Sequence, residues 1–375
     1  MTQLHVQNLA PYLFEKGLLS EQRVVRSGLE IQEISRRNGN FRAHYSDGDG
    51  VLVKQWRLGD SEGPSSLAYE AHFLRLARYH EAFRKLRGLA PELLHFQNGD
   101  RILVTELIHP ATSLTKYHLN VGQIHFPEDA ARTCGRIMGL FHDAGSQAIG
   151  SSDLASIRAD LPLGLGYVDE QYLAGQAEHG PLFLKDYGST DLFQACKEIR
   201  RTWHGRQESL VHGDLRWDNF LLTHGEGVDE DLLNMRLIDW ELVSLGDPIW
   251  DIGFFLAEYV RFWSMAIVNS RRASDPATVR DSAVFPAEAM HSSAKLFWEE
   301  YCQTRALEGD ELEEAYIRLK KYIASSLLFF AWEVVSNQAK NQKVSEIPKF
   351  AKILATLGQE FWSNDDDMMK EWFDL

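Results

Sequence analysis

Two short stretches carry most of the information in this chain. They read Val211-His212-Gly213-Asp214-Leu215-Arg216-Trp217-Asp218-Asn219 and Leu237-Ile238-Asp239-Trp240-Glu241. An Asp, an Asn five residues later and a second Asp behind an apolar run form the smallest set of polar side chains that can move a phosphoryl group from ATP. In such a set Asp214 orients the attacking hydroxyl, while Asn219 and Asp239 hold Mg²⁺ against the phosphates.

The composition is that of an ordinary globular protein, with 44% hydrophobic and 25% charged residues among 375. A chain of this length is too long for one simple core, so we expect two lobes. The net charge is −15, because 54 Asp and Glu outnumber 39 Lys and Arg. This balance disfavours a nucleic-acid partner, which would need a cationic face. It is compatible with a cationic substrate, and the alternative is that the charge only keeps the protein soluble.

The sequence carries no sign of export or of membrane insertion. The densest apolar run, 322–332, contains two Ser and is too short to span a bilayer. Residues 1–5 lack the basic start and apolar core of a signal peptide. Three widely separated cysteines form neither a disulfide framework nor a zinc pattern. We therefore expect a cytoplasmic protein without a membrane partner, and the oligomeric state stays open.

The first part of the chain predicts strands separated by turns. Residues 29–34 alternate with period two, and 41–45 follow as a return strand after the hairpin signal Asn38-Gly39-Asn40. The turn 47–50 leads into a third strand, 51–56. These residues predict an antiparallel meander.

A helix and two further strands complete this region. The helix runs from Ser65 or Ser66 to Arg87, with Gly88 as its stop signal. Strands at 93–96 and 101–107 are joined by a turn at 98–100.

After residue 107 the hydrophobic pattern changes to that of long amphipathic helices, so we place the lobe boundary near Ile108-His109-Pro110. The prediction is an α+β bilobal fold. Residues 1–107 form a small N-terminal lobe that binds ATP, with an antiparallel sheet and one helix. Residues 108–375 form a larger, mainly helical lobe that carries the catalytic loop and the substrate site.

Lys54 and Glu70 are predicted to form a buried ion pair. Lys54 ends an apolar strand, and Glu70 lies on the buried stripe of the following helix with Leu67 and Ala71. A carboxylate on that stripe needs a partner, and the pair would direct the ammonium at the α- and β-phosphates. The alternative is an edge-strand lysine and a glutamate that never meet.

The hairpin at Gly39 and Asn40 lies where a loop would cover a bound nucleotide. A tight turn exposes backbone N–H groups that can face phosphate oxygens. Of the polar residues nearby, Asn40 is the stronger candidate for nucleotide contact. The alternative is that this glycine marks an ordinary turn.

The order of these motifs resembles that of the aminoglycoside phosphotransferase and choline kinase family, a branch of the protein-kinase-like fold. The resemblance extends from about residue 29 to about 258 and is sharpest between 210 and 253. It includes Gly246-Asp247-Pro248 with Asp251, and Phe141-His142 at the end of a predicted helix, 129–142.

The resemblance implies a role for each matching residue. Asp214 corresponds to the catalytic base, and Asn219 and Asp239 correspond to the metal ligands. His212 would anchor the catalytic loop. Asp251 would cap that loop from below, unless it is an ordinary carboxylate at a helix N-terminus.

Other positions are implied less directly. Arg216 stands where protein kinases carry a Lys that touches the transferred phosphoryl group, so it either stabilises that charge or is a surface residue paired with Asp218. The segment Thr105-Glu106-Leu107-Ile108 resembles the hinge between lobes. There the backbone groups of Glu106 and Ile108 would bind the adenine edge.

Three functions remain open at this point. The first is an ATP- and Mg²⁺-dependent phosphotransferase that acts on a hydroxyl of an aminoglycoside, amino alcohol, sugar or amino-acid-like molecule. The second is an enzyme that phosphorylates Ser or Thr of a peptide during natural-product maturation. The third is a non-catalytic nucleotide-binding scaffold, against which the presence of the complete set of catalytic residues argues. The sequence does not decide between ATP and GTP.

Acceptor contacts are expected from the helical lobe. Its aromatic residues include Trp263, Trp298, Trp332 and Tyr259. They would suit an ammonium group through cation–π contacts, or they form the core. Glu241 and Glu258 are the acidic positions nearest in sequence to the motifs.

Overall fold

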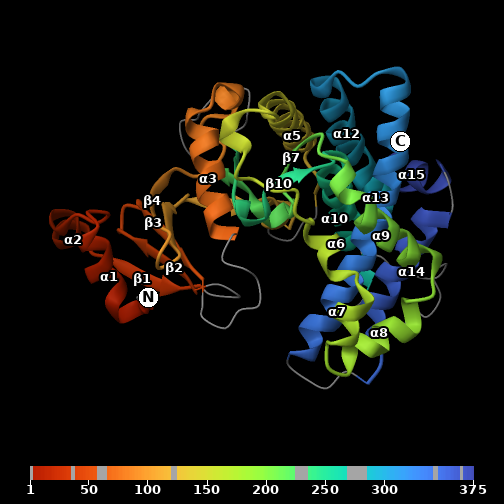
Figure 1. Cartoon of the computed structure of the whole chain (residues 1–375), viewed down its shortest axis with the longest axis horizontal. Coiled ribbons are helices and arrows are strands. Elements are labelled where there is room, and N and C mark those ends of the chain that lie inside the picture. The colour runs from red at the N-terminus through yellow and green to blue at the C-terminus, as the bar shows by residue number, and fades with distance from the viewer. Residues whose placement is uncertain are drawn as a thin grey trace. The chain divides into compact units, whose positions relative to one another are not determined.

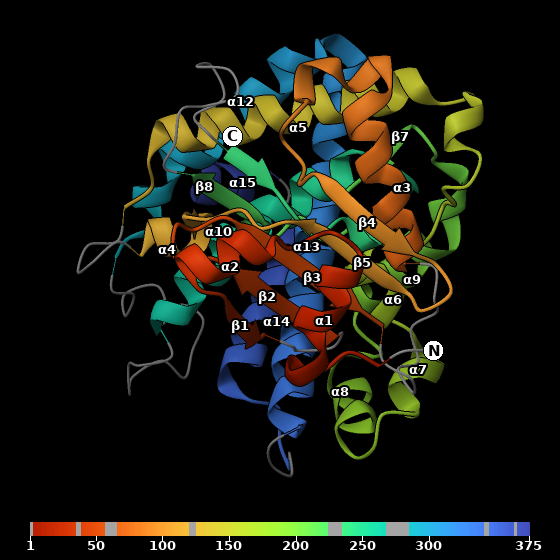
Figure 2. The same ribbon diagram turned by 90° about the vertical axis from the view of Figure 1, so that its left-hand side faces the viewer.

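The computed structural model describes residues 3–34, 39–56, 66–119, 125–223, 235–267, 285–340, 345–363 and 366–375. The chain divides into two compact units (Figures 1 and 2). The first unit is made of residues 1–117 and 218–243, and the second of residues 118–217 and 244–375. The chain thus leaves the first unit beyond the predicted lobe boundary after residue 107, and it returns there for the segment that carries Asn219 and Asp239.

The first unit contains a five-stranded antiparallel sheet, as predicted. Its strands lie in the order β1-β2-β3-β5-β4. Their bounds are β1 Glu30–Glu33, β2 Gly39–His44, β3 Gly50–Gln55, β4 Leu93–Gln97 and β5 Ile102–Glu106. The predicted turns at 47–50 and 98–100 join β2 to β3 and β4 to β5.

The predicted hairpin is confirmed, since β1 and β2 pair antiparallel, but the placement of its turn at residues 38–40 is wrong in the described part. Gly39 and Asn40 belong to β2, where they pair with Gln55 and Lys54 of β3. Asn38 lies outside the described residues. The strand therefore begins two positions earlier than the apolar alternation alone indicated, because ladder pairing with β3 extends it.

The helices of the first unit differ from the single predicted one. They are α1 Val6–Glu15, α2 Glu21–Ser27, α3 Ser66–Tyr79 and the 3₁₀ helix η1 Glu81–Leu86. α3 does not continue to Arg87. It stops because His80 adopts an extended conformation, and the ring Nδ1 of His80 accepts a hydrogen bond from the N–H of Ala82 at 3.2 Å, which starts η1.

Different helices cover the two faces of this sheet, as Figure 1 shows for α1 and α3. Successive side chains of a strand point to opposite faces. Val53 accordingly lies in one apolar cluster with Leu13 of α1. Leu103 lies in a second cluster with Ala71 of α3. Lys54 is paired with Leu103 across β3 and β5, so it shares the face that α3 covers.

A second, three-stranded sheet of the first unit has the order β6-β8-β9. Its strands are β6 Ala111–Ser113, β8 Phe220–Thr223 and β9 Met235–Leu237. The short helices that flank them are α4 Leu114–His118, η5 Trp217–Asn219 and η7 Trp240–Leu242. This small sheet fixes the chain immediately before Asp239 and immediately after Asn219.

The second unit is mainly helical, with one short strand pair. The pair is β7 Ser209–Val211 with β10 Ser244–Gly246. The longer helices are α5 Glu128–Ala148, α9 Asp191–Thr202, α10 Ile249–Ile267, α12 His291–Arg305, α13 Gly309–Ala339 and α14 Lys349–Ser363. The shorter ones are η3 Ser152–Leu154, α6 Leu163–Tyr167, α7 Glu170–Ala174, α8 His179–Tyr187, η4 Trp203–Gly205, η8 Ala287–Met290 and α15 Asp366–Phe373.

Close helix packing builds the core of the second unit. At Gly135 of α5 a side chain would place its Cβ 2.3 Å from the carbonyl oxygen of Phe297 in α12, so only glycine permits this approach. α5 also runs six residues past the predicted end at His142, since Ala144 and Ala148 continue its buried face. Among the described residues, no helix combines the length and apolarity that a membrane span requires.

Candidate active site

Lys54 of β3 is the centre of a charged cluster in the first unit. Its ammonium lies 2.8 and 2.9 Å from the two carboxylate oxygens of Glu70. It also donates to Oδ1 of Asp239 at 2.6 Å. The predicted ion pair with Glu70 is therefore present, and the alternative in which the two side chains never meet is wrong.

Burial and charge act in opposite directions on Lys54. Burial alone would lower the pKa of this amine, but Asp239 and Glu70 together raise it above the usual range for lysine. Lys54 is 7% exposed and Glu70 is 2% exposed. Two carboxylates thus keep a buried ammonium charged.

Asp239 is held in an uncommon backbone conformation. Its φ of 67° and ψ of 57° are left-handed, a region that Asp tolerates better than most residues. The next residue, Trp240, packs on Phe73 of α3 with ring centroids 4.1 Å apart. The indole Nε1 of Trp240 donates to the carbonyl of Leu237 at 2.8 Å. This packing fixes the backbone while the side chain of Asp239 stays 37% exposed.

Asn219 lies beside Asp239 through the β8–β9 pairing. Phe220 is opposite Leu237, and the N–H of Ile238 donates to the carbonyl of Asn219 at 3.0 Å. The two predicted metal ligands therefore extend from neighbouring strand ends.

This donor set fits a magnesium ion. A carboxylate and an amide oxygen are ligands that Mg²⁺ accepts, with water and substrate phosphates completing its shell. In the described part of the chain, no group of three or more His, Cys, Asp and Glu side chains could hold a metal by itself. A magnesium ion at Asn219 and Asp239 would thus depend on phosphate oxygens, as in phosphotransferases.

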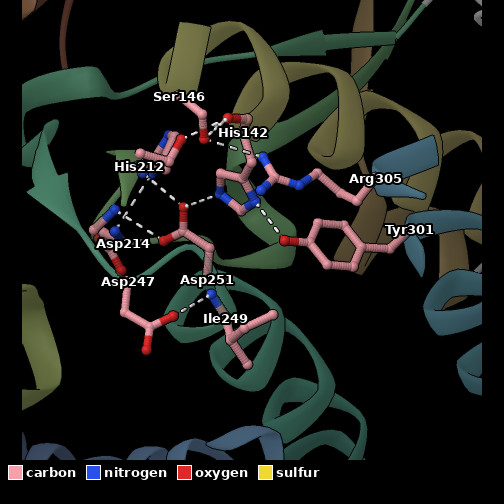
Figure 3. Close-up of polar contacts among 11 residues, drawn as sticks. His142, Ser146, His212, Asp214, Asp247, Ile249, Asp251, Tyr301 and Arg305 are labelled. Carbon is pink, nitrogen blue, oxygen red and sulfur yellow. Dashed lines mark hydrogen bonds and ion pairs between the residues drawn. The ribbon is translucent and has the colours of Figure 1, made fainter. Parts of the chain in front are cut away.

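The loop that follows β7 in the second unit, predicted to be the catalytic loop, is held by Asp251 (Figure 3). The N–H groups of His212 and Gly213 donate to Oδ2 and Oδ1 of Asp251 at 2.7 and 3.1 Å. Gly213 has a φ of 81°, which favours glycine. The prediction that Asp251 caps this loop is confirmed, and the alternative of an ordinary helix-terminal carboxylate is wrong.

His142 of α5 contacts both Asp251 and Tyr301 (Figure 3). Its Nε2 lies 3.1 Å from Oδ2 of Asp251, and its Nδ1 lies 3.1 Å from the hydroxyl of Tyr301. Burial lowers the pKa of His142, although Asp251 opposes the shift. A neutral imidazole therefore donates from Nε2 to the carboxylate and accepts from Tyr301 at Nδ1. No pattern in the sequence singles out Tyr301, which lies 159 residues beyond His142.

Asp214 is bound to Arg216 rather than standing alone. The Nε–H of Arg216 donates to Oδ1 of Asp214 at 2.8 Å. The two terminal nitrogens of the guanidinium bind Glu333 of α13 at 3.0 and 2.9 Å. The predicted alternative pairing with Asp218 is wrong, because the carboxylate of Asp218 accepts instead from the hydroxyl of Ser113 at 3.1 Å.

The predicted adenine and phosphate contacts remain predictions. Asn40 lies across from Lys54 in the β2–β3 ladder, next to the charged cluster. The N–H of Glu106 donates to the carbonyl of Glu92 at 3.0 Å, and its carboxylate forms an ion pair with Arg236 of β9. Ile108 follows β5 and is half-buried. The side chain of Glu106 thus has a structural partner, while the prediction uses the backbone groups of Glu106 and Ile108.

The aromatic residues considered for acceptor binding are core residues. Trp263, Trp298, Trp332 and Tyr259 are all at most 5% exposed. Glu258 is also buried, and its carboxylate accepts from Arg261 at 2.9 Å. These side chains stabilise the second unit through packing, and an acceptor would have to meet other groups.

The comparisons with known proteins agree with this geometry. A family model described as the phosphotransferase enzyme family matches residues 30–281. The 4-hydroxytryptamine kinase of Psilocybe cyanescens is 24% identical over 223 residues, which make up 56% of this chain and 59% of that protein. The chain thus spans less than two thirds of the length of this relative.

Solved structures show the same fold at low sequence identity. Choline kinase from Cryptosporidium parvum superposes with a TM-score of 0.58 at 12% identity, covering 96% of this chain and 95% of the other. The GDP complex of wild-type aminoglycoside 2′-phosphotransferase-IIIa gives 0.52 at 13% identity, covering 96% and 97%. The predicted protein-kinase-like α+β fold is confirmed, and the chain belongs to the phosphotransferase enzyme family.

Proposed function

We propose that this protein transfers the γ-phosphoryl group of ATP to a hydroxyl group of a small molecule, with Mg²⁺ as its cofactor. The observation that carries the proposal is the contact of one buried ammonium, Lys54, with both Glu70 and Asp239. A cation anchored by one carboxylate and shared with a metal-ligating one is the arrangement that phosphoryl transfer requires. Asn219, hydrogen-bonded beside Asp239, completes the polar set.

Each residue has one task in this proposal. Lys54, kept in place by Glu70, binds the α- and β-phosphates. Asn219 and Asp239 would hold Mg²⁺, which would supply positive charge to the phosphates when bound. Asp214 orients the acceptor hydroxyl and takes its proton as the acceptor oxygen bonds to the γ-phosphorus. The bond from that phosphorus to the bridging oxygen breaks, and ADP leaves.

The base of the nucleotide is proposed to bind the backbone carbonyl of Glu106 and the N–H of Ile108, with Gly39 and Asn40 near the phosphates. Backbone groups at a strand end can pair with the edge of a purine without help from side chains. Since the aminoglycoside relative was solved with GDP, GTP belongs in the test alongside ATP.

The acceptor is proposed to be a small cationic alcohol or phenol. The net charge of −15 attracts cations to the protein. Two of the relatives carry names of such acceptors, choline and 4-hydroxytryptamine. Both molecules combine a hydroxyl with a positively charged nitrogen.

The first experiment measures nucleotide binding through the melting temperature. ATP should stabilise the wild type in Mg²⁺ and much less in a chelator, because ligand binding to the folded state raises stability. Asp239→Ala should abolish the Mg²⁺-dependent part. Asp218→Ala removes an exposed carboxylate of η5, next to Asn219, and should behave as the wild type. Equal stabilisation by ATP in Mg²⁺ and in chelator would contradict the proposal.

The second experiment measures ADP or GDP release with a panel of acceptors. The panel contains choline, ethanolamine, 4-hydroxytryptamine, kanamycin and a pool of Ser- and Thr-containing peptides. Turnover with a small alcohol supports the proposed function. Turnover with peptides alone would favour the peptide enzyme, and nucleotide binding without any turnover would favour the scaffold.

A further inference from the structure

Arg216 connects the proposed base to an acidic residue far along the chain. Its Nε–H lies 2.8 Å from Oδ1 of Asp214, and its terminal nitrogens lie 3.0 and 2.9 Å from the two oxygens of Glu333. All three nitrogens of the guanidinium are therefore engaged by carboxylates. Glu333 belongs to α13, and 117 residues separate it from Arg216.

The surroundings hold this guanidinium in a single orientation. It lies over the rings of Phe254, Phe329 and Phe330, with centroid distances of 5.8, 5.8 and 5.9 Å. A planar fork clamped between two carboxylates and packed on aromatic rings is pre-organised. A lysine at this position could not bind both acids with the same geometry.

Glu333 is itself fixed from its other side. Arg261 approaches its Oε2 at 3.5 Å, and Arg261 also donates to Glu258 at 2.9 Å. Glu333 is thus shared by two guanidinium groups. Because the carboxylate of Glu333 already binds two arginines, it is disfavoured as a binding site for the ammonium group of an acceptor.

We propose that Glu333 is a positioning residue that acts through Arg216 to fix the carboxylate of Asp214 for proton acceptance. This inference rests on the proposed function, because it assigns Asp214 as the base. It also assigns Arg216 to the base rather than to the transferred phosphoryl group, since the fork that could bind a phosphate is occupied by Glu333. Precise orientation of a base lowers the barrier of the chemical step without changing how tightly nucleotide binds.

The kinetic test uses Glu333→Gln, Arg216→Lys and the double variant, with Mg²⁺·ATP and water or the best acceptor of the panel. Each single variant should lower kcat by about 10- to 100-fold, the value of a charge-assisted hydrogen bond, while KM for ATP stays within about twofold. The double variant should be no slower than the slower single variant, because both changes break one chain of contacts. Glu314→Gln, at an exposed position of the same helix, should match the wild type.

Three kinetic outcomes would overturn the inference. Glu333→Gln could retain the wild-type kcat. It could raise KM for the acceptor with kcat unchanged, which would make Glu333 a binding residue. The losses in the two single variants could also multiply in the double variant, which would mean that Glu333 does not act through Arg216. If Glu333→Gln melts below the assay temperature, Glu333→Asp replaces it, and it should show a smaller loss of kcat because it keeps the charge.

A spectroscopic measurement separates this inference from the proposed function. In protein labelled with ¹⁵N-arginine, the Nε–H signal of Arg216 is identified by its loss in Arg216→Lys. In the wild type without substrate it should exchange slowly with water, and in Glu333→Gln it should exchange faster and shift. If the wild type turns over no nucleotide but this change occurs, the proposed function fails and the contact chain stands. An unchanged signal overturns the inference, whatever the activity.

Discussion

The two charged clusters of the molecule share one plan but differ in the cation. In the first unit Lys54 lies between the buried Glu70 and the partly exposed Asp239. In the second unit Arg216 lies between Glu333 and Asp214. In each case one carboxylate anchors the cation, and the other is the carboxylate to which we assign a chemical task.

The choice of cation suits the task of its carboxylate. Lysine is a compact charge on a flexible stem, so in the proposed reaction it would shift from Asp239 toward the phosphates when a nucleotide and Mg²⁺ enter. Arginine is a rigid fork that keeps its geometry. The working carboxylates differ accordingly, since the side chain of Asp239 is 37% exposed and that of Asp214 is 19% exposed. A carboxylate that exchanges ligands and a carboxylate that acts as a fixed base thus call for different cations.

The largest expected effect separates the two carboxylates by function. Asp214→Asn should lower kcat by about 10²–10⁴-fold, the usual contribution of a positioned base. It should leave Mg²⁺-dependent ATP stabilisation in place, because the proposed phosphate and metal ligands belong to the other cluster. Steady-state kinetics and melting temperatures measure the two quantities. Loss of ATP binding in Asp214→Asn would break the division of tasks.

The second effect concerns stability in the first cluster. Lys54→Met should destabilise the protein by about 3–5 kcal/mol, because it leaves Glu70 buried without its cation. The double variant Lys54→Met/Glu70→Leu should recover most of this loss and remain inactive, since no group is left to bind the phosphates. Urea unfolding and ADP release provide the two measurements. Recovery of activity in the double variant would exclude Lys54 from the chemistry.

Local sequence patterns predicted the parts of both clusters that depend on neighbouring residues. The alternation in β3 and the helical stripe of α3 placed Lys54 and Glu70 on facing surfaces, and the structure joins them at 2.8 Å. The spacing of Asp214, Asn219 and Asp239 indicated a family that the comparisons confirm. Such features are set by backbone periodicity and motif length, which a single sequence contains.

The contacts that sequence patterns did not predict depend on packing between residues far apart along the chain. Glu333 lies in a long helix among apolar residues, and no spacing rule links it to Arg216. Tyr301 likewise reaches His142 only after α12 has packed on α5. The turn at Gly39 was mispredicted because a glycine between polar residues favours a turn locally, whereas pairing with Gln55 makes it a strand residue.

A third effect tests how the second cluster is supported. Asp251→Asn replaces a carboxylate oxygen by an amide NH₂, which would face one of the buried N–H groups of His212 and Gly213. Leaving a buried N–H group without an acceptor should lower the free energy of unfolding by about 2–3 kcal/mol. It should also displace the loop that carries Asp214, so kcat should fall as well. Tyr301→Phe removes only the hydroxyl that donates to His142, and it should lower the free energy of unfolding by about 1 kcal/mol. Equal losses in the two variants, measured by urea unfolding, would contradict this account of Asp251.

The last effect concerns acid stability. Lys54 and Arg216 stay charged at every acidic pH, as lysine and arginine do at their ordinary pKa values, so neither cation makes the protein sensitive to acid. Acid sensitivity should instead come from buried neutral imidazoles. Burial, with a smaller contribution from His125, lowers the pKa of His118 to about 3.

The unfolded chain takes up a proton at His118 below about pH 6.5, while the folded chain does so only near pH 3. The stability from His118 is therefore complete above about pH 6.5 and falls as the pH drops toward 3. Between pH 7 and pH 5 the loss amounts to about 2 kcal/mol. His118→Phe should remove this part of the difference in unfolding free energy between the two pH values. An unchanged difference in the variant would place the acid-sensitive group elsewhere and would leave the charged clusters as candidates.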